Sequence, residues 1–577
     1  MQLMTLVDVL VLAVYFVVLA FLGIYLARRQ QRLSEFIMPR RFGAAMMTTH
    51  SFGTGTASDQ AVTVASATAM RGISGIWYVW QWLPITPLYW VIAPILRRFR
   101  AVTTADVFRL RFGDSFAVAF AIVGIASMAI KIGILLKGSA ALIESGSGGM
   151  VAAEVAIPVI TVLFVAYGAA GGLSAAIITD FIQGVLTLIF SFILLPFVLH
   201  AVGGFAGINE TIRQSRDGVT MLSIVAPNYI GPFFICMLSL QGLIGVIAQP
   251  HVLGMCAAGR TEWDGRFGFL IGNLLKRVCT VAWCLTAIAG VAWFIQQGQT
   301  LKQVQEGEAD QIYGIIAREF LPGICPGLLG VFIAALLASI MSSCDSFMIS
   351  AAGLFTENIY RPWRKGQSEA HYLWTVRLVS LLVVVGGLVF AFWLDDVVQG
   401  LTIWLKLPAI MGVPLWIGIF WRRANTPGAW ACVITGFGMW WLSAQGWFVG
   451  WVDQLPMDET LGLIDHSGES PKFYEPWKIF AYLFTASLAC VQVSLMTNVA
   501  NRDNLQRFYD LMVTPISKDE VISEPCTLPK DQGSSERRRH IWFGDFFIPI
   551  PSRTSCLGVA FGYVVVAFMV LSFLLLF

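Results

Sequence analysis

Apolar runs long enough to cross a lipid bilayer recur along this chain from residue 5 to residue 577. A membrane-spanning helix needs about 20 predominantly apolar residues, because its backbone polar groups must be satisfied within the hydrocarbon. Only 13% of the residues are charged, whereas about 25% is usual for a soluble domain. These observations predict an all-α, polytopic protein embedded in the lipid bilayer.

Basic residues indicate how the chain crosses the bilayer. Arg and Lys concentrate in alternate loops, such as RRQQRLSEFIMPRR and ENIYRPWRKGQ, which predicts that those loops lie inside and the N-terminus outside. Positive charges follow the first apolar run instead of preceding it, which argues against a cleaved signal peptide. We expect about fourteen spans. Their ranges are 5–26, 43–69, 74–95, 115–143, 151–169, 175–200, 228–253, 266–294, 324–354, 372–394, 398–420, 427–446, 476–498 and 556–577.

Several functional classes are disfavoured by what the sequence lacks. It contains no phosphate-binding loop of the form G-x-x-x-x-G-K-[ST], so an ATP-driven pump is not expected and transport work would come from an ion gradient. The ten cysteines are scattered without a C-x-x-C pair, and we interpret them as small buried apolar residues. No enzymatic activity and no nucleic-acid partner are expected, and the sequence does not indicate the oligomeric state.

Two expected spans contain residues that interrupt a helix. Span 43–69 includes GTGTASD, and span 228–253 includes QGLIG and then QPH, in which Pro250 removes a backbone donor. Each interrupted span opens a group of five, which is the pattern of two inverted repeats in secondary transporters. Asp59 lies in the first interruption, although a carboxylate there costs about 3 kcal/mol to insert.

The repeat hypothesis divides the chain into six expected regions. They are an extra helix with its inside loop (1–42), a first five-helix repeat (43–200), a second five-helix repeat (201–423), additional helices (424–498), a cytoplasmic tail (499–555) and a last helix (556–577). We expect the tail to be a solvated linker, with a regulatory or partner-binding surface as the alternative.

Hydroxyl residues and a second acid gather in span 324–354, which reads SIMSSCDS at 339–346. Ser342 and Ser346 are four residues apart and therefore share a helix face. A single serine in such a helix usually bonds to its own backbone. Several serines beside a broken, acid-bearing helix instead favour a cation site, because hydroxyls and freed carbonyls are ligands for hard cations.

Three further charges lie inside expected spans. Asp180 and Lys276 are near span ends, where an interfacial position with a solvated head is the alternative to a functional role. Lys406 is deeper in its span, which favours a cavity-facing or paired position.

Several ordered motifs resemble those of the sodium:solute symporter family. They are YGAAGGLSAAIITDFIQG (167–184), MSSCDSFMISAAGLFTENIYRPW (341–363) and GVPLWIGIFWRRANTPGAWACVITG (412–436), together with ASDQ (57–60) and QPH (249–251) of the sodium/proline branch. The resemblance implies the leucine-transporter-type fold, with two inverted five-helix repeats and extra helices at both ends. It also implies Na+-driven solute uptake by alternating access.

The resemblance implies ion ligands as well. A first Na+ would contact carbonyls of Ala57, Gln60 and Ser339 and the hydroxyls of Ser342 and Ser343. A second Na+ would contact Asp180, Asp345 and Ser346, although Asp345 stands where a hydroxyl is usual. Asp59 is expected to support the unwound turn and to supply negative potential without binding the ion itself.

At the positions expected to contact the solute, the chain does not resemble one branch of the family alone. The proline branch has aromatic residues where this chain has Gly242 and Val246, whereas the sugar branch implies contacts from Gln81, Gln241 and Lys276. Amides and an ammonium can hydrogen-bond sugar hydroxyls, and Lys276 and Lys406 would equally hold a carboxylate. We expect a Na+ symporter of the plasma membrane for a sugar or related polar solute. The alternatives are an amino acid or organic carboxylate as solute, coupling to protons, and a transporter-like sensor.

Overall fold

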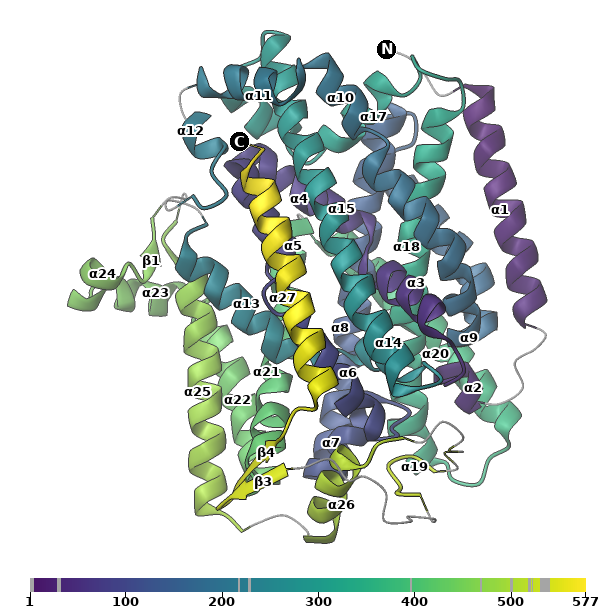
Figure 1. Ribbon diagram of the computed structural model, residues 1–577, viewed down its shortest axis with the longest axis vertical. Coiled ribbons are helices and arrows are strands. Elements are labelled where there is room, and N and C mark those ends of the chain that lie inside the picture. The colour runs from purple at the N-terminus through teal and green to yellow at the C-terminus, as the bar shows by residue number, and fades with distance from the viewer. Residues whose placement is uncertain are drawn as a thin grey trace.

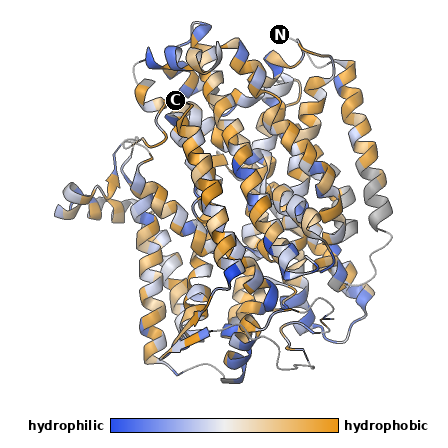
Figure 2. Cartoon of the chain, in the orientation of Figure 1, coloured by the Kyte–Doolittle hydropathy of each residue, from blue (hydrophilic) through white to orange (hydrophobic). Residues whose placement is uncertain are grey.

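The computed structural model describes residues 5–576 except for 28–32, 216–217, 227–229, 395–396, 467–469, 499–501, 517–519, 521, 523 and 530–539. Long helices stand side by side between two ends capped by short helices (Figure 1). Apolar residues dominate the helices between these ends, and hydrophilic residues gather toward the ends (Figure 2). This distribution suits a bundle whose middle lies in lipid.

Eight of the described helices are long and apolar enough to cross a bilayer. They are α8 (Asp114–Ser147), the segment Gly172–Ala201 in α9 and α10, α15 (Glu262–Gln296), α18 (Leu328–Gly353, continued to Trp363), α20 (Glu369–Trp393), α21 (Val397–Phe420), α25 (Glu475–Met496) and α27 (Arg553–Leu574). A ninth span is formed if α13 (Pro232–Val246) and α14 (Pro250–Ala257), bent by 68°, are counted together.

The expected number of fourteen spans is not confirmed, because five of the expected spans correspond to helices that are broken, short, or apolar over only part of their described length, such as Leu6–Val18 in the first span. Their counterparts are α1 (Leu6–Ala27), α3 (Ala44–Gly55) with α4 (Ser58–Arg71), α5 (Trp77–Trp80) with α6 (Tyr89–Arg98), the first part of α9 (Ala153–Phe192), and α22 (Thr426–Leu442). α9 bends at Gly172, which has φ 62°, and a side chain there would collide with Phe36 of α2 (Leu33–Ile37).

Interruptions are present in both expected spans, although the second lies only at QPH, because QGLIG (241–245) is helical within α13. α3 ends at Gly55, and α4 begins at Ser58. The two residues between them, Thr56 and Ala57, are extended. The second break separates α13 from α14, which begins at Pro250. Proline is favourable at this position because the first turn of a helix does not need its N–H.

Short elements lie at both ends of the bundle and on one side of it (Figure 1). α1 begins and α27 ends at the upper end in Figure 1, as an even number of crossings requires. The remaining helices are α7 (Thr104–Phe112), α10 (Leu195–Ala201), α11 (Gly204–Arg213), α12 (Gly218–Met221), α16 (Leu301–Gln303), α17 (Ile312–Phe320), α19 (Arg361–Trp363), α23 (Gly446–Asp453), α24 (Pro456–Leu461) and α26 (Arg502–Val513). Two antiparallel hairpins join β1 (Ile464–Asp465) to β2 (Lys472–Phe473) and β3 (His540–Phe543) to β4 (Phe546–Pro549).

The described part of the tail is folded onto the lower end of the bundle, in contrast to the solvated linker expected from its polarity. Tyr509 of α26 donates its hydroxyl to the carbonyl of Gly418 at 2.9 Å. Arg100 pairs with Glu520, with 2.9 Å between Nη2 and Oε2. Phe508 is fully buried, so apolar contacts also hold α26 in place.

Candidate functional site

The end of α3 approaches the serines of α18 closely. The Ser343 hydroxyl donates to the carbonyls of Gly53 and Thr54, both at 3.1 Å. A Cβ atom at Gly53 would lie 2.5 Å from Ser342 Oγ, so the absence of a side chain permits this approach. The last turn before the first break therefore presents carbonyl oxygens to α18.

A buried polar cluster continues from this contact into α9. Ser342 donates to Asp180, whose other carboxylate oxygen lies 2.6 Å from Nδ1 of His50. The hydroxyls of Thr54 and Ser346 are 2.8 Å apart. All five side chains are buried. They bring oxygen ligands from α3, α9 and α18 to one place, which we call the oxygen cluster.

His50 is a member of this neighbourhood that sequence reasoning missed. An imidazole within an expected span was the available signal, since ionisable residues are rare there and usually have a partner. Its partner, Asp180, is 130 residues away in the sequence. The pairing follows from packing between α3 and α9 and has no local sequence signature.

The residues expected to bind Na+ are only partly brought together. Ala57 is the residue before α4, and its carbonyl accepts the amide of Gln60 at 3.0 Å. The Gln60 side chain donates back across the break to the Gly55 carbonyl at 2.9 Å. Thus Ser343 contacts the carbonyls of Gly53 and Thr54, whereas the Ala57 carbonyl accepts a backbone hydrogen bond from the first turn of α4.

The other predicted ligands lie on α18 itself. Ser339 donates its hydroxyl to the Leu336 carbonyl at 2.7 Å, which leaves its backbone oxygen as the group it could offer an ion. Asp345 is 1% exposed in the same helix, between the serine pair and Ser346.

Asp59 has a partner that the sequence did not reveal. Its Oδ2 lies 2.6 Å from Nζ of Lys131 in α8, and both side chains are buried. The Lys131 ammonium also lies 4.8 Å from the ring centre of Trp404. Lys131 stands in the middle of SMAIKIGIL, so its charge was visible in the sequence but its proximity to Asp59 was not. The ion pair fixes the start of α4 against α8.

A small cavity of about 50 Å³ lies beside both breaks. Its wall combines aromatic rings with polar groups, as is usual for ligand sites. The polar lining residues are Thr54, Gln60, Lys131, Gln249, His251, Asn273, Lys276 and Arg277, and the aromatic ones are Trp82, Tyr89, Phe269, Phe347 and Trp404. We call it the central cavity.

The predicted solute contacts have different positions relative to the central cavity. Val246 and Lys276 line it. Gly242 lies behind the wall, since a Cβ there would be 3.1 Å from the Trp82 indole.

The remaining predicted contacts make other interactions or are buried elsewhere. Gln81 donates to the Tyr78 carbonyl at 2.7 Å, and Gln241 is buried in α13. Lys406 forms a 2.9 Å ion pair with Glu475 of α25. Of the two positions expected for Lys406, cavity-facing or paired, the structure shows the paired one, and neither Lys406 nor Glu475 is among the residues that line the central cavity.

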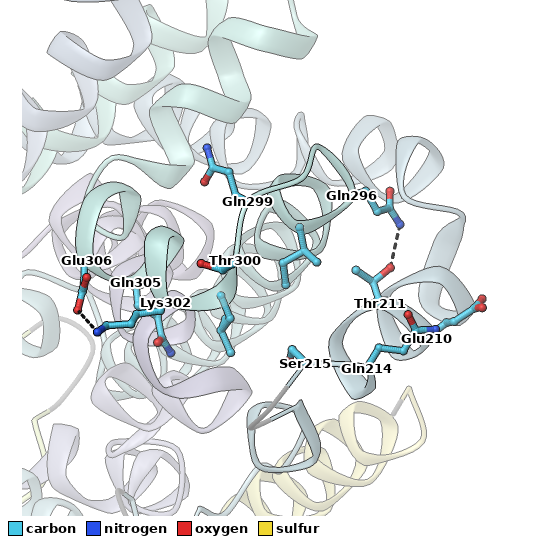
Figure 3. Close-up of a pocket in the computed structure, with 12 residues that line it drawn as sticks. Glu210, Thr211, Gln214, Ser215, Gln296, Gln299, Thr300, Lys302, Gln305 and Glu306 are labelled. Carbon is cyan, nitrogen blue, oxygen red and sulfur yellow. Dashed lines mark hydrogen bonds and ion pairs between the residues drawn. The ribbon is translucent and has the colours of Figure 1, made fainter.

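A larger cavity, of about 1070 Å³, lies among α11, α15 and α16 (Figure 3). Amide and hydroxyl side chains dominate its wall. Gln296 donates to the Thr211 hydroxyl at 2.9 Å, and Lys302 pairs with Glu306 at 3.6 Å. None of its lining residues belongs to either helix break, so this cavity is separate from the candidate site.

The sodium:solute symporter family model matches residues 36–436. The sodium/pantothenate symporter of Escherichia coli (strain K12) is 26% identical over 368 residues, which cover 62% of this chain and 71% of the relative. The high-affinity proline transporter of Bacillus subtilis (strain 168) is 26% identical over 436 residues, covering 72% and 87%. Sodium/glucose cotransporter 1 of Oryctolagus cuniculus is 26% identical over 485 residues, covering 74% and 70%.

The fold is also that of a solved transporter. The structure of a Na+-coupled sialic acid symporter matches with a TM-score of 0.70 at 16% identity, covering 86% of this chain and 99% of that chain. The family match spans more than half of the sequence and includes both breaks and the α18 serines. The protein therefore belongs to the sodium:solute symporter family, with Na+ as its coupling ion.

Proposed function

We propose that this symporter imports a small polar organic solute, a sugar or a related compound, across the plasma membrane together with Na+. The observation that carries the proposal is the buried approach of α3 to α18 at the first break. There, carbonyls of Gly53 and Thr54 meet the hydroxyl of Ser343. Carbonyl and hydroxyl oxygens are suitable ligands for a hard cation. An amino acid or an organic carboxylate is the alternative class of solute.

In this proposal the first Na+ binds between the break and α18. The hydroxyls of Ser342 and Ser343 contribute from α18, and the Gly53 and Thr54 carbonyls lie beside them. Small shifts of the break would add the predicted carbonyls of Ala57, Gln60 and Ser339. A second Na+ would use Asp180, Asp345 and Ser346.

Binding of Na+ provides the coupling. An ion shared by α3 and α18 ties together two elements that otherwise move independently, and it favours the arrangement in which the central cavity binds solute. Thermodynamic linkage then requires the solute to raise the affinity for Na+ by the same factor. The transporter then closes on the outside and opens on the inside, where the Na+ concentration is low, and releases Na+ and the solute there. The extracellular N-terminus predicted from the basic loops is part of this proposal.

Replacing both α18 serines tests the proposed ion site. In purified full-length protein, NaCl is expected to raise the thermal midpoint more than KCl does, because an ion that binds the folded state stabilises it. The double variant Ser342→Ala, Ser343→Ala is expected to abolish this difference. Ser380→Ala is the control, since Ser380 is also buried but bonds to the Val376 carbonyl of its own helix. A Na+-specific shift that persists in the double variant would contradict this ion site.

Uptake by proteoliposomes gives the corresponding test of transport. Radiolabelled pantothenate, proline and glucose are supplied with an inward Na+ gradient or with K+ in its place. At least one is expected to accumulate only with the Na+ gradient. Identical accumulation of a transported solute with and without the gradient would contradict coupling.

A further inference from the structure

We propose that the transported solute carries an anionic group, such as a carboxylate, which binds in the central cavity between Lys276 and the first break. This inference rests on the proposed function and specifies the chemical class of its solute. Under this inference, a sugar-like solute would be a sugar acid, and neutral sugars would be disfavoured as substrates.

The first argument is the charge of the cavity wall. Its cationic residues are Lys131, Lys276 and Arg277. Asp59 compensates Lys131 at 2.6 Å. Among the residues that the structure describes, no carboxylate lies within ion-pairing distance of Lys276 or Arg277. The wall therefore carries more positive than negative charge.

Burial makes this excess charge significant. Lys276 is 6% exposed and Arg277 1% exposed. Arg277 donates to the Val79 carbonyl at 3.3 Å, and the Lys276 ammonium lies 5.5 Å from the ring centre of Trp82. Neither contact supplies a negative charge. An uncompensated charge is costly in the interior of a membrane protein, and an anionic solute would reduce that cost.

The second argument is the type of hydrogen-bonding atom left in the wall. Arg277 Nε, Trp404 Nε1 and His251 Nδ1 are buried without a hydrogen-bond partner among the described residues. The first two are donors, and the third is a donor in one tautomer. Acceptors in the wall are Gln60 Oε1, which is also buried without a partner among the described residues, and the side-chain amide oxygens of Gln249 and Asn273. An ionised carboxylate has only acceptors, so it can accept hydrogen bonds from Arg277 Nε and Trp404 Nε1.

The position of Lys276 connects the anion to the break. Its Nζ lies 3.8 Å from the place that a Cβ of Gly55 would occupy. The cavity volume of about 50 Å³ has room for one small group of the solute, and the remainder requires the wall to open. An anion beside Lys276 would also lie near the proposed first Na+. Their attraction in a low-dielectric interior would contribute to the mutual increase in affinity.

Matched pairs of acids and uncharged analogues test this inference. Thermal midpoints of the purified full-length protein are measured in NaCl and in KCl with pantothenate against panthenol and gluconate against glucose. We expect each carboxylate to stabilise the protein, more strongly in NaCl than in KCl. Its concentration for half-maximal stabilisation is expected to be lower than that of the uncharged analogue by about tenfold or more, because the analogue lacks a charged hydrogen bond.

Variants at Lys276 assign the effect to this side chain. Lys276→Gln is expected to raise the carboxylate concentration for half-maximal stabilisation by about 10- to 100-fold, and Lys276→Arg to retain most of the affinity. Lys302→Gln removes an exposed ammonium in the wall of the separate, larger cavity and is the control. The thermal shift caused by NaCl alone shows that each variant is folded.

The outcomes separate the two proposals. Na+-dependent stabilisation by panthenol or glucose, without stabilisation by the acids, would overturn the anionic solute and leave Na+ coupling intact. Equal carboxylate affinity in Lys276→Gln would also overturn it. Stabilisation by solutes that is the same in NaCl and KCl would instead count against the proposed function.

Discussion

Asp59 and Lys131 form a buried ion pair between α4 and α8, with 2.6 Å between Oδ2 and Nζ. The sequence predicts that Asp59 supports the unwound turn, and the ion pair gives this support a specific form. Its carboxylate compensates the positive charge of Lys131, which lines the central cavity together with Thr54. We propose that Asp59 acts on the ion through Lys131 as well as through its own negative potential.

This pairing leads to a prediction at the residue scale. Asp59→Asn leaves Lys131 buried and unpaired, which typically destabilises a protein by about 3–5 kcal/mol. The Na+ concentration for half-maximal stabilisation is expected to rise at least about tenfold. The double variant Asp59→Asn, Lys131→Gln removes both charges and is expected to recover much of the Na+ affinity. An unchanged Na+ titration in Asp59→Asn would show that this interpretation is wrong.

At the scale of elements, the important feature of the interrupted helix is that the end of α3 closely approaches α18. Gly53 lies in the last turn of α3, where any side chain would meet Ser342. The approach allows backbone carbonyls to reach the Ser343 hydroxyl. The extended residues Thr56 and Ala57 then separate α3 from α4.

A methyl group at Gly53 is therefore expected to separate α3 from α18. Gly53→Ala should lose the thermal shift specific to Na+, because the carbonyl and hydroxyl ligands no longer meet. Gly146→Ala in α8 is a matched control, since a Cβ there has nothing within 4 Å. Wild-type Na+ response in Gly53→Ala would show that the close approach is unnecessary for ion binding.

At the scale of the whole molecule, the two ends of the bundle differ in what they carry. α10, α11 and α17 lie at the upper end with the beginning of α1 (Figure 1). α19 and the docked tail segments α26 and β3–β4 lie at the lower end. The predicted orientation places the upper end outside the cell, because the loops rich in Arg and Lys are at the lower end.

Labelling of single cysteines in intact cells tests this orientation. In a background whose exposed cysteines are replaced (Cys236, Cys325 and Cys556), Lys302→Cys is expected to react with a membrane-impermeant maleimide added outside. Lys365→Cys, beyond α19, is expected to react only after the cells are permeabilised. Both side chains are exposed, so accessibility within the fold is matched. The opposite labelling pattern would mean that the N-terminus is inside.

Local properties explain which features could be predicted from the sequence. Apolar runs predict helices in lipid, and Gly, Thr and Pro at 53–57 and 250 predict breaks, because both effects depend on neighbouring residues. The α18 serines were recognisable for the same reason. By contrast, His50–Asp180 and Asp59–Lys131 join residues 130 and 72 positions apart. Lys406 was visible as a buried charge, but its partner Glu475 was not.

Short-range sequence patterns identify a helical membrane protein with two broken helices, a serine-rich helix and the motifs of a Na+ symporter. The packing of distant helices determines which carbonyls face Ser343 and which charges neutralise one another. It also places Lys276 at a cavity without an acidic partner among the described residues. The reason is physical. Helix formation and interruption follow from nearby residues, whereas the compensation of a buried charge depends on which distant helices pack together.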